Sequence, residues 1–112
     1  MKKIKIIEVI PNFNSKTGEE LGPAEQTEYV VKNLTRPAVF GTCYEKIKIE
    51  PSTLQDFILV QGVNCYVSEA DERGGINLFN KEPVKIERGE KKKIFFAMFD
   101  NPLHFVVECL DE

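Results

Sequence analysis

The fold is decided by residues 84–110, VKIERGEKKKIFFAMFDNPLHFVVECL, in which short apolar stretches alternate with turn signals. Within residues 103–110 every second side chain is apolar, as in a strand with one buried face: Leu103, Phe105, Val107 and Cys109. Residues 93–99, KIFFAMF, are apolar at consecutive positions, which predicts a strand covered on both faces. Gly89 predicts a hairpin turn, because glycine supplies the positive φ that tight turns require. Asp100-Asn101-Pro102 predicts a second turn.

The same alternation of short apolar strands with turn signals extends toward the N-terminus. Residues 43–50 alternate, with Cys43, Ile47 and Ile49 on one face, and Pro51-Ser52 ends this segment. Residues 56–60, DFILV, form a short apolar run that predicts a strand covered on both faces, and Gln61-Gly62 predicts a turn or a bulge. Four further segments complete the pattern: a strand at 63–68, a polar loop at 69–75 and short strands at 76–79 and 84–88.

The N-terminal part is less regular. Residues 2–10 predict a strand whose alternation shifts phase at Ile6-Ile7, as at a bulge or a change of partner sheet. Residues 11–26 are rich in Pro, Gly and Asn and predict a long loop or arm. Residues 23–34 fit a helix starting at Pro23 or a strand through Tyr29–Val31, and the clustered β-branched and aromatic residues favour the strand.

Seven or eight short strands split by turns predict an all-β fold, an antiparallel β-sandwich of Ig-like or jelly-roll-like type, with a small barrel as the alternative. We divide the chain into an N-terminal strand and extended arm at 1–26 and a β-sandwich domain at 27–112. The arm has two interpretations. The strand at 2–10 pairs within its own sandwich, or it is laid on a neighbouring subunit.

Composition narrows the function classes. The chain has 112 residues, 42% hydrophobic and 29% charged, as expected for one ordinary globular domain. The formal charge of −3 argues against a general nucleic-acid coat or a polybasic membrane binder. The apolar start is interrupted by Lys5 and Glu8 and ends at Pro11, so it falls short of the roughly 7–15 apolar residues of a secretory signal. We therefore expect a protein made in the cytoplasm, with no membrane partner.

The three cysteines predict buried core positions rather than a disulfide framework. Cys43, Cys65 and Cys109 are widely spaced, odd in number and set among apolar residues. The alternatives are a Cys43–Cys65 or Cys65–Cys109 disulfide, or a zinc site completed by His104. Strand parity disfavours the zinc site, because His104 points away from the face that holds Cys109.

No catalytic residue, cofactor or metal site is predicted. His104 is the only histidine, and its apolar neighbours make it a sheet residue beside a turn. Three carboxylates in one loop, Glu69, Asp71 and Glu72, resemble a calcium site in composition but lack the spacing of an EF-hand, so a solvated acidic loop is favoured.

Candidate partner contacts come from two segments. Residues 81–93 hold six basic against three acidic side chains, a local balance of +3, which protects a sheet edge or contacts a partner. The apolar N-terminal strand adds area for strand addition to a neighbour. The candidate contact residues are Ile4, Ile6, Ile7, Val9, Lys91, Lys92 and Lys93.

Residues 56–110 resemble the small β-sandwich proteins of tailed-bacteriophage virions, of the auxiliary (decoration) capsid or head-fibre type. The resemblance is carried by a series of short pieces in order: Phe57 to Val60, Gly62-Val63-Asn64, Tyr66-Val67-Ser68, Pro83-Val84-Lys85-Ile86, Gly89-Glu90 and Leu103 to Val107. Cupredoxins share some of these pieces, but His104, Cys109 and Met98 without a second histidine disfavour copper.

The resemblance implies a non-enzymatic virion structural protein that contacts other virion proteins, such as a major capsid protein, and associates with itself. Two alternatives from other classes remain: a small cytoplasmic binding module, such as a phage-encoded inhibitor of a host defence protein, and a ligand-binding β-barrel.

Overall fold

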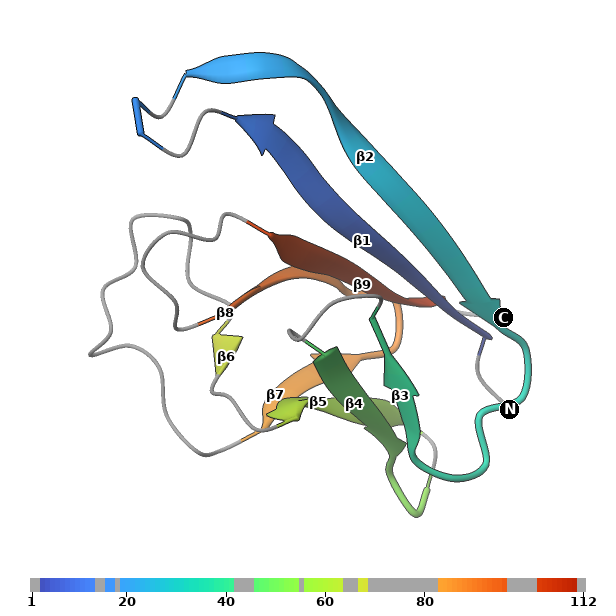
Figure 1. The fold of residues 1–112 in the computed structure, drawn as a ribbon. Coiled ribbons are helices and arrows are strands. Elements are labelled where there is room, and N and C mark those ends of the chain that lie inside the picture. The colour runs from blue at the N-terminus through green and yellow to red at the C-terminus, as the bar shows by residue number, and fades with distance from the viewer. Residues whose placement is uncertain are drawn as a thin grey trace.

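The computed structural model describes residues 3–13, 16–17, 19–41, 46–54, 56–63, 67–68, 83–96 and 103–110. These residues form nine strands in two antiparallel sheets, which confirms the predicted all-β sandwich (Figure 1). The five-stranded sheet has the order β2-β1-β9-β8-β6, from β2 (Glu20–Val31), β1 (Lys3–Phe13), β9 (His104–Leu110), β8 (Lys91–Phe96) and β6 (Val67–Ser68). The four-stranded sheet has the order β3-β4-β5-β7, from β3 (Ala38–Phe40), β4 (Lys46–Pro51), β5 (Phe57–Val63) and β7 (Val84–Glu87).

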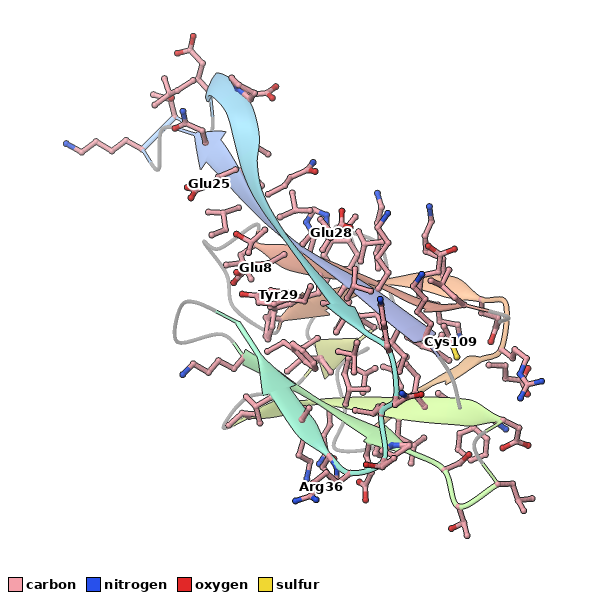
Figure 2. All side chains as sticks on the ribbon, turned by 90° about the vertical axis from the view of Figure 1, so that its right-hand side faces the viewer. Glu8, Glu25, Glu28, Tyr29, Arg36 and Cys109 are labelled. Carbon is pink, nitrogen blue, oxygen red and sulfur yellow. The ribbon has the colours of Figure 1, made fainter. Side chains whose placement is uncertain are left out.

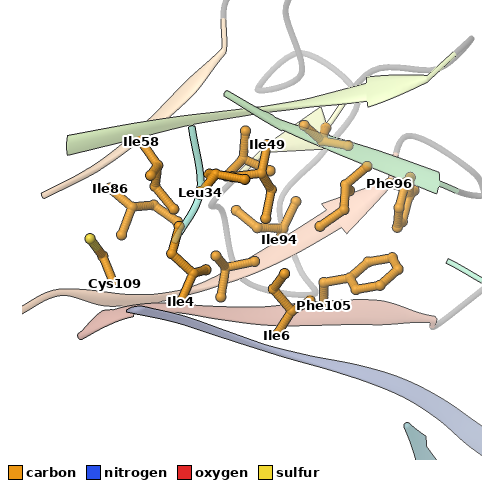
Figure 3. Close-up of a cluster of buried hydrophobic side chains, with 14 of the residues drawn as sticks. Ile4, Ile6, Leu34, Ile49, Ile58, Ile86, Ile94, Phe96, Phe105 and Cys109 are labelled. Carbon is orange, nitrogen blue, oxygen red and sulfur yellow. The ribbon is translucent and has the colours of Figure 1, made fainter. Parts of the chain in front are cut away.

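The core lies between the two sheets and is made by the side chains that point inward at every second position of the strands (Figure 3). The alternation predicted for residues 103–110 is confirmed, because Leu103, Phe105, Val107 and Cys109 are all buried. The rings of Phe96 and Phe105 meet edge to face with centroids 5.8 Å apart. Among the described residues, fifteen buried side chains form the cluster: Ile4, Ile6, Leu34, Ile47, Ile49, Ile58, Val60, Val67, Ile86, Ile94, Phe96, Leu103, Phe105, Val107 and Cys109.

A tight turn at Gly89 joins the two sheets. Gly89 has φ 85°, as predicted for a turn residue. Its N–H donates to the Cys109 carbonyl at 2.7 Å, and the Cys109 N–H donates to the Glu90 carbonyl at 3.0 Å. The strands on either side do not pair as a hairpin, because β7 pairs with β5 and β8 pairs with β9. The turn is therefore confirmed, but it connects the layers of the sandwich rather than two neighbours in one sheet.

The N-terminal strand runs differently from the prediction. β1 alternates without interruption through Ile6-Ile7, with Ile4, Ile6 and Glu8 all buried, so the predicted phase shift at that point is wrong. Register shifts occur later, between Ile10 and Asn12 and between Asn12 and Phe13. The alternation fails as a guide here because Glu8 occupies an inward position that polarity alone assigns to the outside.

The long loop predicted at 11–26 is also wrong. Residues up to Phe13 continue β1, and residues from Glu20 belong to β2, which pairs antiparallel with β1. The strand favoured for residues 23–34 is confirmed up to Val31. The division proposed at residue 26 falls inside β2. β1 pairs within its own chain, between β2 and β9.

Two further details differ from the sequence prediction. Gln61-Gly62 forms no turn. Both residues continue the strand β5 and lie opposite Lys48 and Ile47 of β4. β3 was not predicted. The expectations for Cys43, Cys65, the loop at 69–75, the strand at 76–79, residues 97–99 and the turn at 100–102 lie outside the described residues.

Candidate interaction surface

The β1–β2 hairpin reaches beyond the sandwich. β9 accompanies β1 from Lys3 to Val9, whereas β1 and β2 continue to pair as far as Phe13 opposite Glu20. Ile10 still packs against the core. Residues 11–13 and 20–24, which we call the distal ribbon, therefore lie past the end of the sheet and have only each other as described strand neighbours (Figure 1). Figure 2 shows the same projection from the side.

The sequence of the distal ribbon explains how it stays extended while bending. Between the pairs Ile10–Glu25 and Phe13–Glu20, β2 contains two more residues than β1, which is the signature of β-bulges. Gly22 lets the Asn12 side chain approach the β2 backbone closely, since a Cβ added at Gly22 would lie 3.3 Å from the side-chain amide nitrogen (Nδ2) of Asn12. Pro11, Gly22 and Pro23, which contributed to the loop prediction, are therefore accommodated in a bulged, twisted two-stranded ribbon.

β2 is the outermost strand of the five-stranded sheet and is strongly acidic. Its twelve residues include Glu20, Glu25 and Glu28 and no Lys or Arg. Glu28 reaches Lys5 of β1 at 3.9 Å, and both side chains are well exposed. Two of the most exposed apolar side chains, Leu21 (58%) and Val30 (47%), lie on this strand. An edge strand offers backbone N–H and C=O groups for pairing with another chain, so β2 combines such an edge with negative charge.

The outer face of the five-stranded sheet carries a partly apolar centre. Ile7 lies opposite Val106, and Val9 lies opposite His104, all of them half-buried. His104 in turn packs against the Phe95 ring, with centroids 5.3 Å apart. Phe95 is only 9% exposed although it stands outside the core cluster between the sheets. Apolar side chains are therefore partly or fully buried on the outer face of this sheet as well, apart from the core between the two sheets.

The structure places the predicted partner contacts in four different settings. Ile4 and Ile6 lie in the core, so they offer no surface to a partner, whereas Ile7 and Val9 are on the outer face. Lys91 and Lys93 are exposed on β8. Lys92 has the opposite orientation, and its ammonium donates to the Lys85 carbonyl at 2.9 Å. The structure thus does not bring the seven residues together on one surface.

Glu8 is the polar residue that the sequence analysis missed. Its side chain is fully buried at an inward position of β1, opposite Thr27 of β2 and Phe105 of β9. Tyr29 is its diagonal neighbour on the same face of β2, and both are labelled in Figure 2. The signal was present in the spacing Ile4-Ile6-Glu8-Ile10, which keeps Glu8 in step with three apolar residues. Burying a carboxylate is costly. A buried glutamate therefore distinguishes this position from the apolar residues at the other inward positions of β1.

The predicted parity of His104 and Cys109 is confirmed. Cys109 is buried in the core, while His104 lies half-buried on the outer face beside Phe95. In the described ranges no group of three or more His, Cys, Asp or Glu side chains is placed to hold a metal ion. The acidic loop with Glu69, Asp71 and Glu72 lies outside those ranges. The part of the chain that the structure describes also contains no helix with the length and apolarity of a membrane span.

Comparison with protein-family models, with curated proteins and with solved structures found no match.

Proposed function

We propose that this protein is non-enzymatic and works through protein–protein contacts made by the distal ribbon and the β2 edge. The observation that carries the proposal is the extension of the β1–β2 hairpin past the last β9 partner at Val9. Two-stranded ribbons are marginally stable alone, so a ribbon of this kind is held by its continuity with the sheet and offers its surface to a partner. Strand addition at β2 supplies main-chain hydrogen bonds without any special side-chain motif.

The class of assembly we propose is a tailed-bacteriophage virion, in which the chain acts as an auxiliary protein on other virion proteins. The support is the resemblance of residues 56–110 to small virion sandwich proteins, together with the projecting ribbon. In this role the sandwich is a rigid body, and the ribbon and the β2 edge contact a neighbouring virion protein such as a major capsid protein. The protein is made in the host cytoplasm and resides in the virion.

A shortened hairpin tests the proposal. Replacing residues 11–24 with Asn-Gly joins Ile10 to Glu25, a pair that already lies opposite in the sheet, through a two-residue turn. We expect this variant to lose at least tenfold in binding to capsids assembled from the major capsid protein of the phage that encodes the chain, measured by co-sedimentation. A matched control is Leu54→Ser, which removes an 83% exposed apolar side chain from the connection between β4 and β5 in the other sheet and should bind as wild type.

Three results contradict the proposal. Wild-type protein that is absent from particles by mass spectrometry overturns the virion assignment. Unchanged binding by the shortened variant overturns the role of the ribbon. Stoichiometric capture of a host enzyme, or a small molecule retained through purification, supports the inhibitor or the ligand-binding barrel instead.

A further inference from the structure

The edge strand β2 contains one regular stretch. From Glu25 to Val31 each residue of β2 lies opposite one residue of β1 without a register shift, whereas the bulges fall on the distal side, where β2 also contains Pro23. β2 ends the order of the five-stranded sheet, so among the described strands β1 is its one sheet neighbour (Figure 1). A regular edge strand holds a further strand in a single register, because each added residue continues the same ladder of main-chain hydrogen bonds.

The edge strands of the two sheets differ in charge. β7, which ends the four-stranded sheet, carries Lys85, and the Lys92 ammonium from β8 donates to the Lys85 carbonyl at 2.9 Å. Lysines at a strand edge oppose pairing with a further strand. β2 has no Lys or Arg among its twelve residues, and its regular stretch carries the exposed side chains of Glu25 and Glu28. The β2 edge therefore favours an incoming strand that brings positive charge.

The two faces of β2 set the residue pattern of such a strand. Val30 and Glu28 lie on the outer face, opposite Lys5 and Ile7 of β1, while Glu25 lies on the other face. Every described strand pair in the two sheets is antiparallel. An antiparallel addition places an apolar residue opposite Val30, a basic residue two positions later opposite Glu28, and a second basic residue three positions after that opposite Glu25.

Glu28 is available for this contact. Its carboxylate lies 3.9 Å from the Lys5 ammonium, and both side chains are well exposed. Exposed ion pairs of this kind contribute little to stability, so Glu28 accepts a second cation at small cost.

We propose that the Glu25–Val31 edge of β2 binds an extended segment of the partner protein as an added antiparallel strand, and that this segment has the pattern apolar-x-basic-x-x-basic. This inference rests on the proposed function and names the chemistry of the partner segment. Main-chain hydrogen bonds hold the segment, and the two carboxylates select its register. Two copies of the β2 edge would bring together glutamates and no cation, so the partner is another protein rather than a second copy.

A peptide titration tests the pattern. The probe is the end-blocked peptide Thr-Val-Thr-Lys-Thr-Thr-Lys-Thr, added to the isotope-labelled full chain and followed by NMR of the backbone amides. We expect saturable shifts concentrated at Glu25–Val31, and at least tenfold weaker binding when glutamate replaces both lysines of the peptide. N-methylation of alternate peptide residues should abolish binding in one of the two possible alternations and preserve it in the other, because only every second amide of an added strand faces β2.

An exchange of charges tests the register. Glu28→Lys should weaken binding of the peptide at least tenfold, and a peptide with glutamate in place of its first lysine should bind this variant as the original peptide binds wild type. Glu50→Lys makes the same change at an exposed position of β4, in the other sheet, and should bind as wild type. Glu28→Gln, with a smaller expected loss, is the milder variant if Glu28→Lys lowers the melting temperature. An equal loss in Glu50→Lys, or no recovery by the exchanged peptide, overturns the pairing.

The shortened hairpin separates this inference from the proposed function. Replacing residues 11–24 retains Glu25–Val31, so this variant should bind the peptide as wild type although it should lose binding to particles. A wild-type chain that does not bind the peptide, or binds it with shifts outside β2 and β1, overturns the inference. Loss of particle binding by the shortened variant then still supports the proposed function.

Discussion

Two deletions of the N-terminal region should differ sharply in how much stability they remove. Removing residues 1–22 takes away all of β1, which lies between β2 and β9, and the first residues of β2. Ile4 and Ile6, exposed by 1% and 0%, are lost with it. Truncating a buried isoleucine costs about 2–5 kcal/mol. Two such losses, added to the loss of both ladders, match the whole free energy of unfolding of a small domain, about 5–15 kcal/mol. We therefore expect this deletion to abolish folding.

Replacing residues 11–24 with Asn-Gly should instead leave the sandwich intact. Among the replaced residues whose side chains the structure describes, none belongs to the core cluster, and Ile10, which packs against it, is retained. We expect a loss of about 1 kcal/mol or less, because surface changes away from the core rarely cost more. Urea denaturation followed by far-ultraviolet circular dichroism measures both variants. A cooperative, native-like transition for the 1–22 deletion, or a collapsed midpoint for the shortened hairpin, would refute this account of how β1 is anchored.

Three substitutions, two of them set against a milder comparison variant, test the sandwich itself. Phe105→Ala should cost about 3–5 kcal/mol in chemical denaturation, because it removes a fully buried ring that meets Phe96, whereas Val39→Ala at a 55% exposed site should stay within about 0.5 kcal/mol. Gly89→Ala should cost about 1–2 kcal/mol through its φ of 85° alone, since no atom lies within 4 Å of an added Cβ, and Gly89→Asn should cost less. Cys109→Ser should cost about 1–3 kcal/mol by burying a hydroxyl in the core, and a melting temperature equal to wild type would contradict its core placement.

The parts of the fold that could be predicted are those where one local signal decides the structure. The alternation of residues 103–110 needs only one buried face, and β9 has it. The turn at Gly89 needs only a positive φ. Which strands pair was not predictable from these signals, because β7 and β8 are adjacent in sequence but enter different sheets. Strand pairing depends on contacts between distant segments, and local patterns do not record them.

The candidate surface was harder to predict for a related reason. Residues 11–26 carry Pro, Gly and Asn at positions typical of a loop, yet residues 11–13 of β1 and 20–26 of β2 are extended strands in the described structure. The β1–β2 pairing holds them, and bulges absorb the irregular spacing. The phase shift predicted at Ile6-Ile7 is wrong, because the strand keeps its alternation through this point and buries the Glu8 carboxylate. Of the predicted contact residues, Ile4 and Ile6 were assigned to a partner surface but lie in the core. The sequence alone does not distinguish the two roles, because an apolar side chain on a strand is suited to the core and to a partner contact alike.

The position of β1 connects stability with the proposed contact. One strand supplies Ile4 and Ile6 to the core, pairs on both sides, and then continues into the distal ribbon. The ribbon is thus an extension of an ordered sheet rather than a tethered segment. Ordering a flexible arm on binding costs conformational entropy, whereas a ribbon already fixed by its sheet avoids much of that cost. β2, which has twelve residues, pairs alongside β1 from the sandwich into the ribbon. A partner that adds a strand there therefore binds one continuous, preformed surface, with the core of the sandwich holding its orientation.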